Sequence, residues 1–380
     1  MRIPFNKPSI VGSELDHIAQ AVREGHLSGD GLYSRKCHAW LEQHLKCAKA
    51  LLTHSCTAAL EMAAILAGIR PGDEVIMPSF TFVSTANAFV LRGGVPVFVD
   101  VRRDSLNLDE RLIEAAVTPR TRAVVPVHYA GVPCAMDEIM AIAARHGLIV
   151  VEDAAQALLA DYKGRRPGAI GHLGCLSFHE TKNVISGEGG ALLVNDERLV
   201  ERAEVIREKG TNRSQFFRGE VDKYTWVDIG SSYLPSELVG AFLYAQLEHA
   251  DRINAKRLRL CAAYRGGLAD LERSGALALP RPDPEGTAGN GHLFYILLKN
   301  SGTRTALIAY LKARGIHAVF HYVPLHSSPA GRRFGRAAGP LPVTDDVSGR
   351  LLRLPLYFEL AESDVLSIAA AIGDFFSGRD

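Results

Sequence analysis

The chain has 380 residues, of which 47% are hydrophobic and 22% are charged, and its formal net charge is +1. A chain of this length can bury a large core without disulfides, and it has room for two domains. The near-zero charge gives no electrostatic case for binding nucleic acid or an anionic membrane. No apolar run approaches the roughly 18 residues of a membrane span, and the first eight residues lack the apolar core of a signal peptide. We therefore expect a cytoplasmic protein.

The N-terminal part begins with an extended arm, followed by helices predicted at residues 13–24 and 34–45. Beyond residue 49, short apolar runs alternate with helical patterns. Strands are predicted at residues 50–53, 74–78, 95–99, 123–127 and 148–153. Helices are predicted at residues 58–66 and 137–145, and another opens within 79–86. This alternation is typical of an α/β fold with a large, mostly parallel sheet.

Strands at residues 175–178 and 191–194 enclose a polar loop and a glycine-rich turn, and helical patterns follow at 197–208 and 236–265. After a proline-rich break, the sequence predicts a smaller α/β unit. Its predicted strands are 292–298, 316–321 and 354–357, its helices 303–314, 344–350 and 362–376, and its long loop 327–342. We therefore divide the chain into the N-terminal arm with a large domain, residues 1–245, and a small C-terminal domain, residues 246–380.

The cysteines and histidines do not predict a metal site. Six cysteines are scattered along the chain, and none forms a C-x-x-C pair or stands beside a histidine at ligand spacing. His317, His321 and His326 are near neighbours, but their segment has the pattern of a strand followed by a turn. We predict no metal.

Lys182 lies in the polar loop between the strands predicted at 175–178 and 191–194. A lysine amine attacks carbonyl carbons well only where its pKa is lowered or where it is already condensed as an imine. Upstream, Asp153 ends the apolar strand predicted at 148–153. Pyridoxal phosphate requires both groups, a lysine for its aldehyde and an acid against its ring nitrogen. Since an isolated loop lysine is more often solvated, this prediction depends on what else lies nearby.

Polar and aromatic side chains follow several other predicted strands. Ser55 and Thr57 stand at a helix start, where backbone N–H groups and the helix dipole favour an anion, although an ordinary N-cap is the alternative. Phe82, His128 and Gln156 also follow strand ends. Because ligands gather at the carboxyl ends of parallel strands, we expect one site at this edge of the sheet.

The segment at residues 209–226 mixes basic and aromatic side chains. Its composition suits a loop that touches a phosphorylated, ring-bearing ligand or a partner subunit, and a solvated loop is the alternative. Arg213, Arg218 and Lys223 are its candidate cations for such a phosphorylated ligand.

Two motifs resemble those of the sugar-nucleotide aminotransferases, a branch of the fold-type I enzymes that use pyridoxal phosphate. They are EDAAQ at residues 152–156 and SFHxxK at residues 177–182, and the resemblance covers essentially the whole chain. The segments 78–93, 178–183, 207–219 and 228–234 are similar to the branch that makes dTDP-4-amino-4,6-dideoxygalactose. The implied fold is a large sheet domain with a smaller α/β domain at its C-terminal side.

The resemblance implies a role for each matching residue. Lys182 would condense with the cofactor's aldehyde and shuttle the proton, and Asp153 would keep the ring nitrogen protonated. Phe82 would stack on the ring. Gln156 and His179 would lie around the ring and its phenolic oxygen, and the phosphate would be held by Thr57, the backbone of Ala58, and Ser177.

A homodimer with shared active sites is also implied. Relatives often complete the phosphate site with an asparagine of the partner subunit, but Leu234 stands at that position here. Ser231 and Ser232 of the partner subunit are the candidates that remain. The segment 321–326 matches the family's substrate-side loop, which makes His321, Tyr322 and His326 candidates near the sugar.

The implied reaction transfers the amino group of L-glutamate to dTDP-4-keto-6-deoxy-D-glucose. The product would be dTDP-4-amino-4,6-dideoxy-D-galactose, for a surface glycan of the enterobacterial common antigen type. Another keto nucleotide sugar or the gluco epimer is the first alternative. A cofactor-bound regulator is the second, although no basic helix-turn-helix is visible. A nucleotide-dependent oxidoreductase is the third, but no G-x-G-x-x-G stands at a first strand–helix turn.

Overall fold

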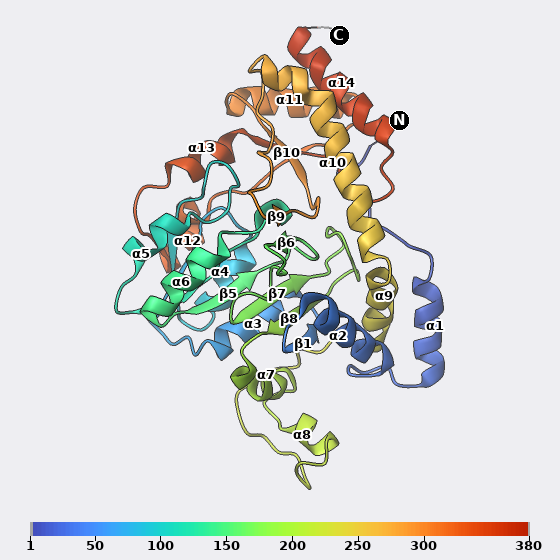
Figure 1. The fold of residues 1–380 in the computed structure, drawn as a ribbon, viewed down its shortest axis with the longest axis vertical. Coiled ribbons are helices and arrows are strands. Elements are labelled where there is room, and N and C mark those ends of the chain that lie inside the picture. Colours follow the sequence, from blue (N-terminus) through green and yellow to red (C-terminus); the bar gives the residue numbers. More distant parts are fainter. Residues whose placement is uncertain (1–2, 379–380) are drawn as a thin grey trace.

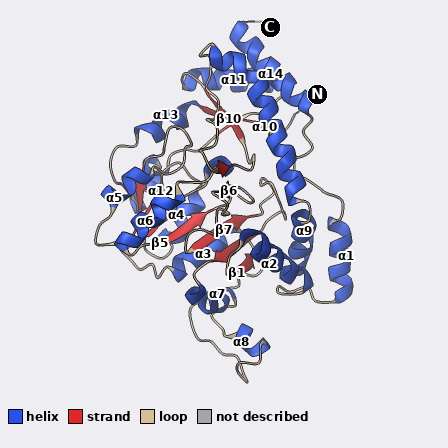
Figure 2. Cartoon of the chain, viewed as in Figure 1, coloured by secondary structure: helices blue, strands red, loops and turns tan. Residues whose placement is uncertain are grey.

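The computed structural model describes residues 3–378, so residues 1–2 of the expected arm and residues 379–380 of the expected small domain lie outside it. Eight strands form its central sheet (Figures 1 and 2). They are β1 Lys49–Thr53, β2 Glu74–Pro78, β3 Val95–Val99, β4 Thr121–Val124, β5 Ile149–Asp153, β7 Leu173–Ser177, β8 Gly190–Val194 and β12 Arg336–Ala337. Their order is β1-β8-β7-β5-β4-β2-β3-β12.

Only β8 runs against its neighbours in this sheet. It pairs antiparallel with β1 and β7, whereas the other pairs are parallel. The parallel strands β2, β5 and β7 therefore end at the same edge, where Asp153 and Ser177 are the last residues of β5 and β7. The predicted α/β class with a mostly parallel sheet is confirmed.

Helices cover both faces of this sheet (Figure 1). They include α2 Leu32–Leu45, α3 Cys56–Leu66, α4 Val83–Val90, α6 Met136–His146, α7 Val200–Arg207 and α9 Glu237–Leu247. The α3 helix is rich in alanine and buried along nearly its whole length. Its Ala59 and Ala63 belong to the same buried cluster as Val151 and Leu192 of the sheet. Small side chains let this helix approach the strands closely, which fixes its N-terminus at the edge where the strands end.

A second, smaller sheet lies beside the C-terminal helices (Figure 1). Its order is β10 Phe294–Leu297, β13 Leu351–Leu354 and β11 Val319–Phe320. The helices α10 Ala250–Arg273, α11 Ser301–Ala313 and α14 Glu362–Ser377 contribute to a separate apolar core with these strands. The boundary at residues 245/246 stays a prediction, and β12 from beyond it pairs with β3 of the large sheet.

Several sequence expectations about elements are wrong, including the loop expected at 209–226, which contains the short helix α8 Arg213–Phe217. The helix predicted at 236–265 is two helices, because α9 ends at Leu247 and α10 begins at Ala250. The segment predicted as a loop at 327–342 contains α12 Pro329–Phe334 and the edge strand β12. The start of α12 has an ordinary sequence signal, since Ser328 caps it and Pro329 occupies its first turn.

The remaining α-helices and strands are short or peripheral. They are α1 Glu14–Glu24, α5 Ile113–Ala116, α8 Arg213–Phe217, α13 Pro342–Arg350, β6 Asp161–Tyr162 and β9 Thr287–Ala288. Within residues 3–378, no helix combines the length and apolar character that crossing a membrane requires.

Glu74 anchors the edge strand β12 to the sheet. This carboxylate is fully buried at the start of β2, and it accepts hydrogen bonds from Arg336 at 2.9 and 3.1 Å and from Arg120 at 2.6 Å. Burial opposes its charge, but the bonds from Arg336, Arg120 and Thr118 prevail and lower its pKa to about 2. The unfolded chain therefore binds more protons than the folded protein between the ordinary carboxyl pKa and pH 2.

We therefore expect the free energy of unfolding to fall as the pH drops from about 4.5 towards 2. Glu74→Gln should be less stable at pH 7 and should lose this part of the acid dependence. Urea unfolding of both proteins at several pH values measures it. An acid slope that is unchanged in the variant would assign the effect to other carboxylates.

Candidate active site

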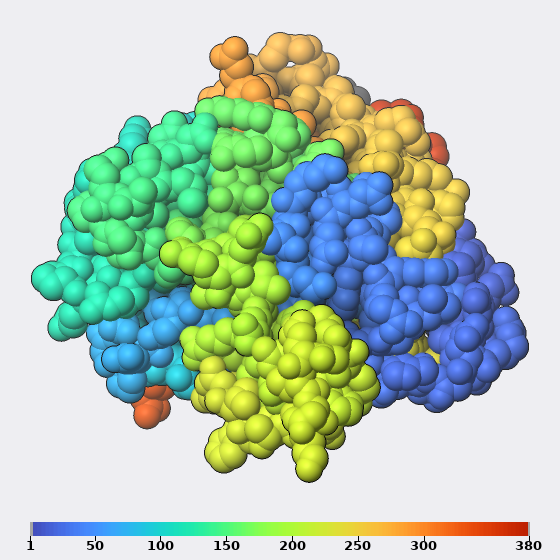
Figure 3. Space-filling view, turned by 60° about the horizontal axis from the view of Figure 1, so that its bottom comes forward, coloured from blue at the N-terminus to red at the C-terminus, as the bar shows by residue number. Residues whose placement is uncertain are grey.

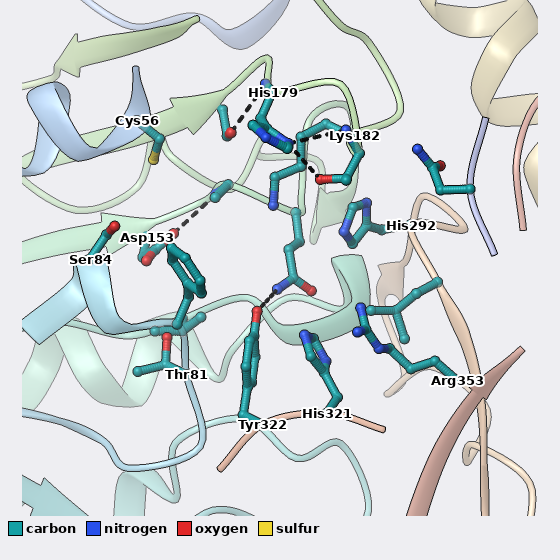
Figure 4. A pocket seen from close by; sticks show the side chains of 18 of the residues that line it. Cys56, Thr81, Ser84, Asp153, His179, Lys182, His292, His321, Tyr322 and Arg353 are labelled. Carbon is teal, nitrogen blue, oxygen red and sulfur yellow. Dashed lines mark hydrogen bonds between the residues drawn. The ribbon is translucent and has the colours of Figure 1, made fainter. Parts of the chain in front are cut away.

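A cavity of about 660 Å³ opens at the edge where β2, β5 and β7 end. Its lining comes from distant parts of the chain, including Phe5 and Asn6 of the N-terminal arm, the start of α3, the loop after β7, and β11 with β13 of the small sheet. Figure 4 shows side chains from these segments pointing into one space. The cavity thus lies between the large sheet and the small one.

Lys182 reaches into this cavity from the loop after β7 (Figure 4). Backbone bonds make the loop compact: the Lys182 N–H donates to His179 O at 2.9 Å, and the Glu180 N–H donates to Gly187 O at 2.8 Å. The side chain is partly buried, and loss of hydration lowers the pKa of the ammonium, with a further lowering from the positive charge of Arg353. Both effects make the free, nucleophilic amine more accessible.

Asp153 faces the same space from the end of β5. The Thr85 hydroxyl donates to Asp153 Oδ2 at 2.7 Å, and the Ala155 N–H donates to Oδ1 at 3.2 Å. Thr85 is itself bonded to Thr81 at 2.8 Å. The carboxylate is therefore fixed in orientation, and each oxygen retains acceptor capacity for a ring N–H. Sequence reasoning missed the two threonines, whose spacing of four residues was the available signal.

Gln156 lies just after β5 and forms a hydrogen bond with Tyr322, which lies just after β11 of the small sheet. Its Oε1 accepts the Ala130 N–H at 2.8 Å, which orients the amide so that Nε2 donates to the Tyr322 hydroxyl at 3.2 Å. His321 is buried beside it, with Nδ1 3.0 Å from the Tyr129 hydroxyl. The structure therefore brings the predicted residues Gln156, His321 and Tyr322 together around the space that Lys182 enters.

The start of α3 supplies hydroxyl groups at another wall. Thr57 Oγ1 lies 2.8 Å from Ser84 Oγ, and both residues line the cavity together with Ser177. The Ala58 N–H, however, donates to Ser55 Oγ at 3.1 Å, and Ala58 does not line the cavity. The predicted helix start is thus present, with its hydroxyls rather than the Ala58 N–H facing the cavity.

Two predicted residues stand at the rim. Phe82 immediately precedes α4 and is 57% exposed, which leaves a ring face available for stacking. His179 Nδ1 accepts the Thr181 N–H at 3.2 Å and lies 2.9 Å from the Thr181 hydroxyl. Its Nε2 lies 3.6 Å from Glu188. His179 lines the cavity next to Lys182, and its catalytic role stays a prediction.

Several predicted residues do not line the cavity of this chain. Arg213, Arg218, Lys223, Ser231 and Ser232 belong to a segment, residues 208–232, that projects from the body (Figure 3). Arg218 forms ion pairs with Glu204 and Glu220, each at 2.7 Å.

Two predicted histidines serve the scaffold. His326 contacts the Ser79 hydroxyl at 2.7 Å and Asp345 at 3.3 Å, away from the cavity. His128 is fully buried and does not line the cavity, because its ring nitrogens lie 2.9 Å from Glu152 and 3.0 Å from the Cys134 N–H, which donates to Nδ1.

Sequence reasoning also missed His292. Its Nδ1 lies 3.0 Å from Asn183 Oδ1, and the Asn183 amide donates to Asn254 at 2.8 Å and to Asn290 O at 3.0 Å. These bonds assign the proton of His292 to Nδ1 and leave Nε2 as an acceptor on the cavity side. Burial lowers the pKa of His292 well below its ordinary value, so the ring stays neutral. Sequence reasoning missed Arg353 as well, which lines the cavity from β13.

The model of the DegT/DnrJ/EryC1/StrS aminotransferase family matches residues 8–373. The chain belongs to this family. The spore coat polysaccharide biosynthesis protein SpsC of Bacillus subtilis (strain 168) is 34% identical over 386 residues, which span 100% of this chain and 98% of SpsC. The S. venezuelae protein DesV, solved in complex with a ketimine intermediate, is 34% identical with a TM-score of 0.89 over 98% of both chains.

The aminotransferase from Psychrobacter cryohalolentis has a TM-score of 0.92 at 26% identity, over 100% of this chain and 99% of that one. These likenesses confirm the predicted fold-type I architecture. The protein is thus a sugar aminotransferase of the DegT/DnrJ/EryC1/StrS family, and pyridoxal phosphate is the cofactor of that family.

The cavity of this aminotransferase fits the cofactor. A partly buried amine, a fixed carboxylate, an exposed aromatic ring and a group of hydroxyls at a helix start converge in it. Strand β8 also passes so close to that helix start that a Cβ on Gly190 would lie 2.4 Å from the backbone nitrogen of Cys56. Backbone packing therefore holds the helix start, where an anionic group would bind, in a fixed position.

Proposed function

We propose that this aminotransferase converts dTDP-4-keto-6-deoxy-D-glucose and L-glutamate into dTDP-4-amino-4,6-dideoxy-D-galactose. The proposal includes a cytoplasmic homodimer with shared sites and a role in synthesis of a bacterial surface glycan. One observation carries the chemistry: Lys182 and the fixed carboxylate of Asp153 face one cavity. The similarity to SpsC, a polysaccharide biosynthesis protein, supports the glycan destination.

When bound, pyridoxal phosphate supplies an aldehyde for condensation with amines and a ring that stabilises negative charge. Lys182 would hold the cofactor. As a free amine, it would then remove the α-proton of glutamate in the first half-reaction and deliver a proton to C4 of the sugar in the second. Asp153 would keep the ring nitrogen protonated. Thr57, Ser84 and Ser177 would hold the phosphate, and Phe82 would cover one ring face.

The face from which Lys182 returns its proton sets the configuration at C4 of the sugar. We propose the galacto product, and the gluco epimer or another keto nucleotide sugar is the alternative. Incubation of the protein and cofactor with glutamate and dTDP-4-keto-6-deoxy-D-glucose, followed by NMR of the product, tests both points. No consumption of this sugar would contradict the substrate, and a gluco coupling pattern would contradict the epimer.

The alternative function that is not enzymatic is a cofactor-bound regulator. A regulator with bound pyridoxal phosphate would also show a visible absorption band. Added glutamate, however, would neither abolish that band nor release 2-oxoglutarate. Measuring 2-oxoglutarate after one equivalent of cofactor has reacted therefore separates a regulator from an aminotransferase.

The cations of segment 208–232 remain our candidates for the diphosphate, reached from the partner subunit. We expect Arg218→Ala to raise KM for the nucleotide sugar about tenfold, since charged hydrogen bonds contribute about 1.5–3 kcal/mol each and Arg218 must first leave its pairs with Glu204 and Glu220. KM for glutamate should stay the same. The matched control is Arg198→Ala, an exposed arginine paired with Asp196. Equal sugar KM values in both variants would remove Arg218 from the site.

A further inference from the structure

A second cavity, of about 470 Å³, is lined by the loop after β3, the helix α10 and the proline-rich segment 280–284. Within residues 3–378, Leu293 is the one residue that lines both this cavity and the catalytic one. Ala130 also lies in the wall between them, because it lines the second cavity and its N–H donates to Gln156 of the first at 2.8 Å. The volume is typical of small-molecule sites and exceeds what a single inorganic ion fills.

The hydroxyl of Tyr295 marks the deep end of this second cavity. Tyr295 lies in β10, lines the cavity and is only 4% exposed. Among residues 3–378, its hydroxyl has no hydrogen-bond partner, and burying such a group unpaired is costly. Burial and the negative charge of Asp104 raise the pKa of Tyr295, so the hydroxyl stays protonated. The deep end therefore offers one donor to an acceptor oxygen of a ligand.

Two arginines without carboxylate partners stand at the open end. Arg265 of α10 and Arg281 are exposed and line the cavity, and neither forms a salt bridge within residues 3–378. The Arg265 Nη1 donates to the carbonyl of Pro280 at 2.9 Å, which brings its guanidinium beside the residue that precedes Arg281. The two cations thus come from separate segments that meet at the rim.

The acidic side chains of the lining do not offset these two arginines. Asp104 binds Arg102, the third arginine of the lining, at 2.8 Å, and Asp283 accepts the Gly289 N–H at 2.7 Å. With three arginines and two aspartates, the lining has a formal charge of +1. Two guanidinium groups can share the three oxygens of a phosphate, whereas a carboxylate offers two oxygens. The open end therefore favours a phosphate.

Apolar side chains form the walls between the two ends. Leu258 and Ala262 of α10 stand on one side and Val132 and Phe294 contribute the others. Burial raises the pKa of the Cys261 thiol in this wall to about 11, so it is a packing group rather than a nucleophile. A fitting ligand thus has a phosphate, an apolar or ring-shaped middle and an acceptor oxygen at its far end. A nucleoside phosphate has these parts in this order, because its base carries carbonyl oxygens.

We propose that the second cavity binds a nucleoside monophosphate, with the phosphate at Arg265 and Arg281 and a carbonyl oxygen of the base at the Tyr295 hydroxyl. This site is additional to the catalytic one and does not depend on which sugar is aminated. The bound nucleotide would lie against Ala130 and Leu293, in the wall of the catalytic cavity, which is a position suited to an effector.

Two partly exposed cysteines report on the two cavities separately. Cys261 lines the second cavity and Cys56 the catalytic one, whereas the other four cysteines are buried. In enzyme loaded with pyridoxal phosphate, iodoacetamide alkylation of each is followed by mass spectrometry of the peptides at mildly alkaline pH. We expect dTMP at ten times its Kd to slow alkylation of Cys261 about tenfold, since only the unoccupied fraction reacts. The Cys56 rate shows in the same sample whether dTMP also enters the catalytic cavity.

The double variant Arg265→Ala/Arg281→Ala should raise the dTMP concentration for half-protection of Cys261 about ten- to a hundredfold, as loss of charge-assisted hydrogen bonds does. Tyr295→Phe should raise it about fivefold, since a neutral hydrogen bond contributes less. Half-protection is compared rather than the rate itself, because Arg265 also influences the Cys261 thiol. Arg259→Ala, on another exposed arginine of α10, is the matched control. Thermal unfolding checks that each variant is folded.

Absence of Cys261 protection by millimolar dTMP overturns the proposal. Equal half-protection in the double variant and in Arg259→Ala overturns it too, because the phosphate then does not lie at these arginines. Inorganic phosphate that protects as well as dTMP would show that the cavity binds any phosphate, and thymidine that protects as well would show that it binds no anion; either result contradicts the assignment. Failure to aminate dTDP-4-keto-6-deoxy-D-glucose would contradict the proposed function alone.

Discussion

Lys182→Ala should reduce the rate of amino transfer by at least about ten-thousandfold, the upper range for a positioned acid–base group. Lys182 is expected both to hold the cofactor and to move the proton, and its loop places the amine inside the cavity. Its lowered pKa leaves a larger fraction of the amine unprotonated, and so able to act as a base, at neutral pH. Single-turnover measurements with glutamate, monitored by visible absorbance, give the rate.

The variant should still fold and take up pyridoxal phosphate, because Asp153, Phe82 and the hydroxyls at the start of α3 are unchanged. Added methylamine should restore part of the activity, since a small amine can replace the missing side chain as a base. Lys163→Ala is the control, a loop lysine that pairs with Asp137 on the surface. Borohydride reduction of the wild-type enzyme should attach the cofactor to the peptide with Lys182. Attachment to another peptide would exclude the whole assignment.

The pairing of Lys182 with Asp153 could be predicted because it follows from strand direction. Parallel strands end at a common edge, so an acid at the end of β5 and a lysine just after β7 must lie near each other. The same reasoning placed Thr57 and Phe82 at the cavity wall. It failed for His128, which lies beyond the end of β4 and is buried against Glu152.

Arg353, His292 and Thr85 could not be found in this way. Arg353 lies in β13 of the small sheet, and His292 lies just before β10. The position of the small sheet over the large one depends on packing between segments that are distant in sequence. Thr85 faces Asp153 only because α4 begins where it does. Strand β12 is also hard to predict, because it has only two residues. The ion pairs of Arg336 with buried Glu74 hold it at the sheet edge. No local sequence pattern marks the contacts of Arg353, His292 or Arg336, whereas Thr85 is marked only by its spacing of four residues from Thr81.

Asp153→Asn should lower kcat by about a hundred- to a thousandfold, the range for loss of one preorganised electrostatic group. The substitution keeps size and shape but removes the negative charge that would hold a proton on the ring nitrogen. An asparagine has one acceptor oxygen where Asp153 has two, and those two now accept from Thr85 and from the Ala155 N–H. The amide NH₂ must therefore face either the Thr85 hydroxyl or the Ala155 N–H, and the ring nitrogen loses its anionic partner either way.

Thr85→Val separates charge from orientation. It removes the hydroxyl that donates to Asp153 at 2.7 Å but leaves the carboxylate in place, so we expect a loss of only about tenfold in kcat. KM for glutamate should change little in either variant, because Lys182 is untouched. Steady-state kinetics with thermal unfolding as the check on folding measure both effects. If Asp153→Asn retains nearly the wild-type kcat, or if Thr85→Val loses as much as Asp153→Asn, then the charge of Asp153 is not what activates the ring.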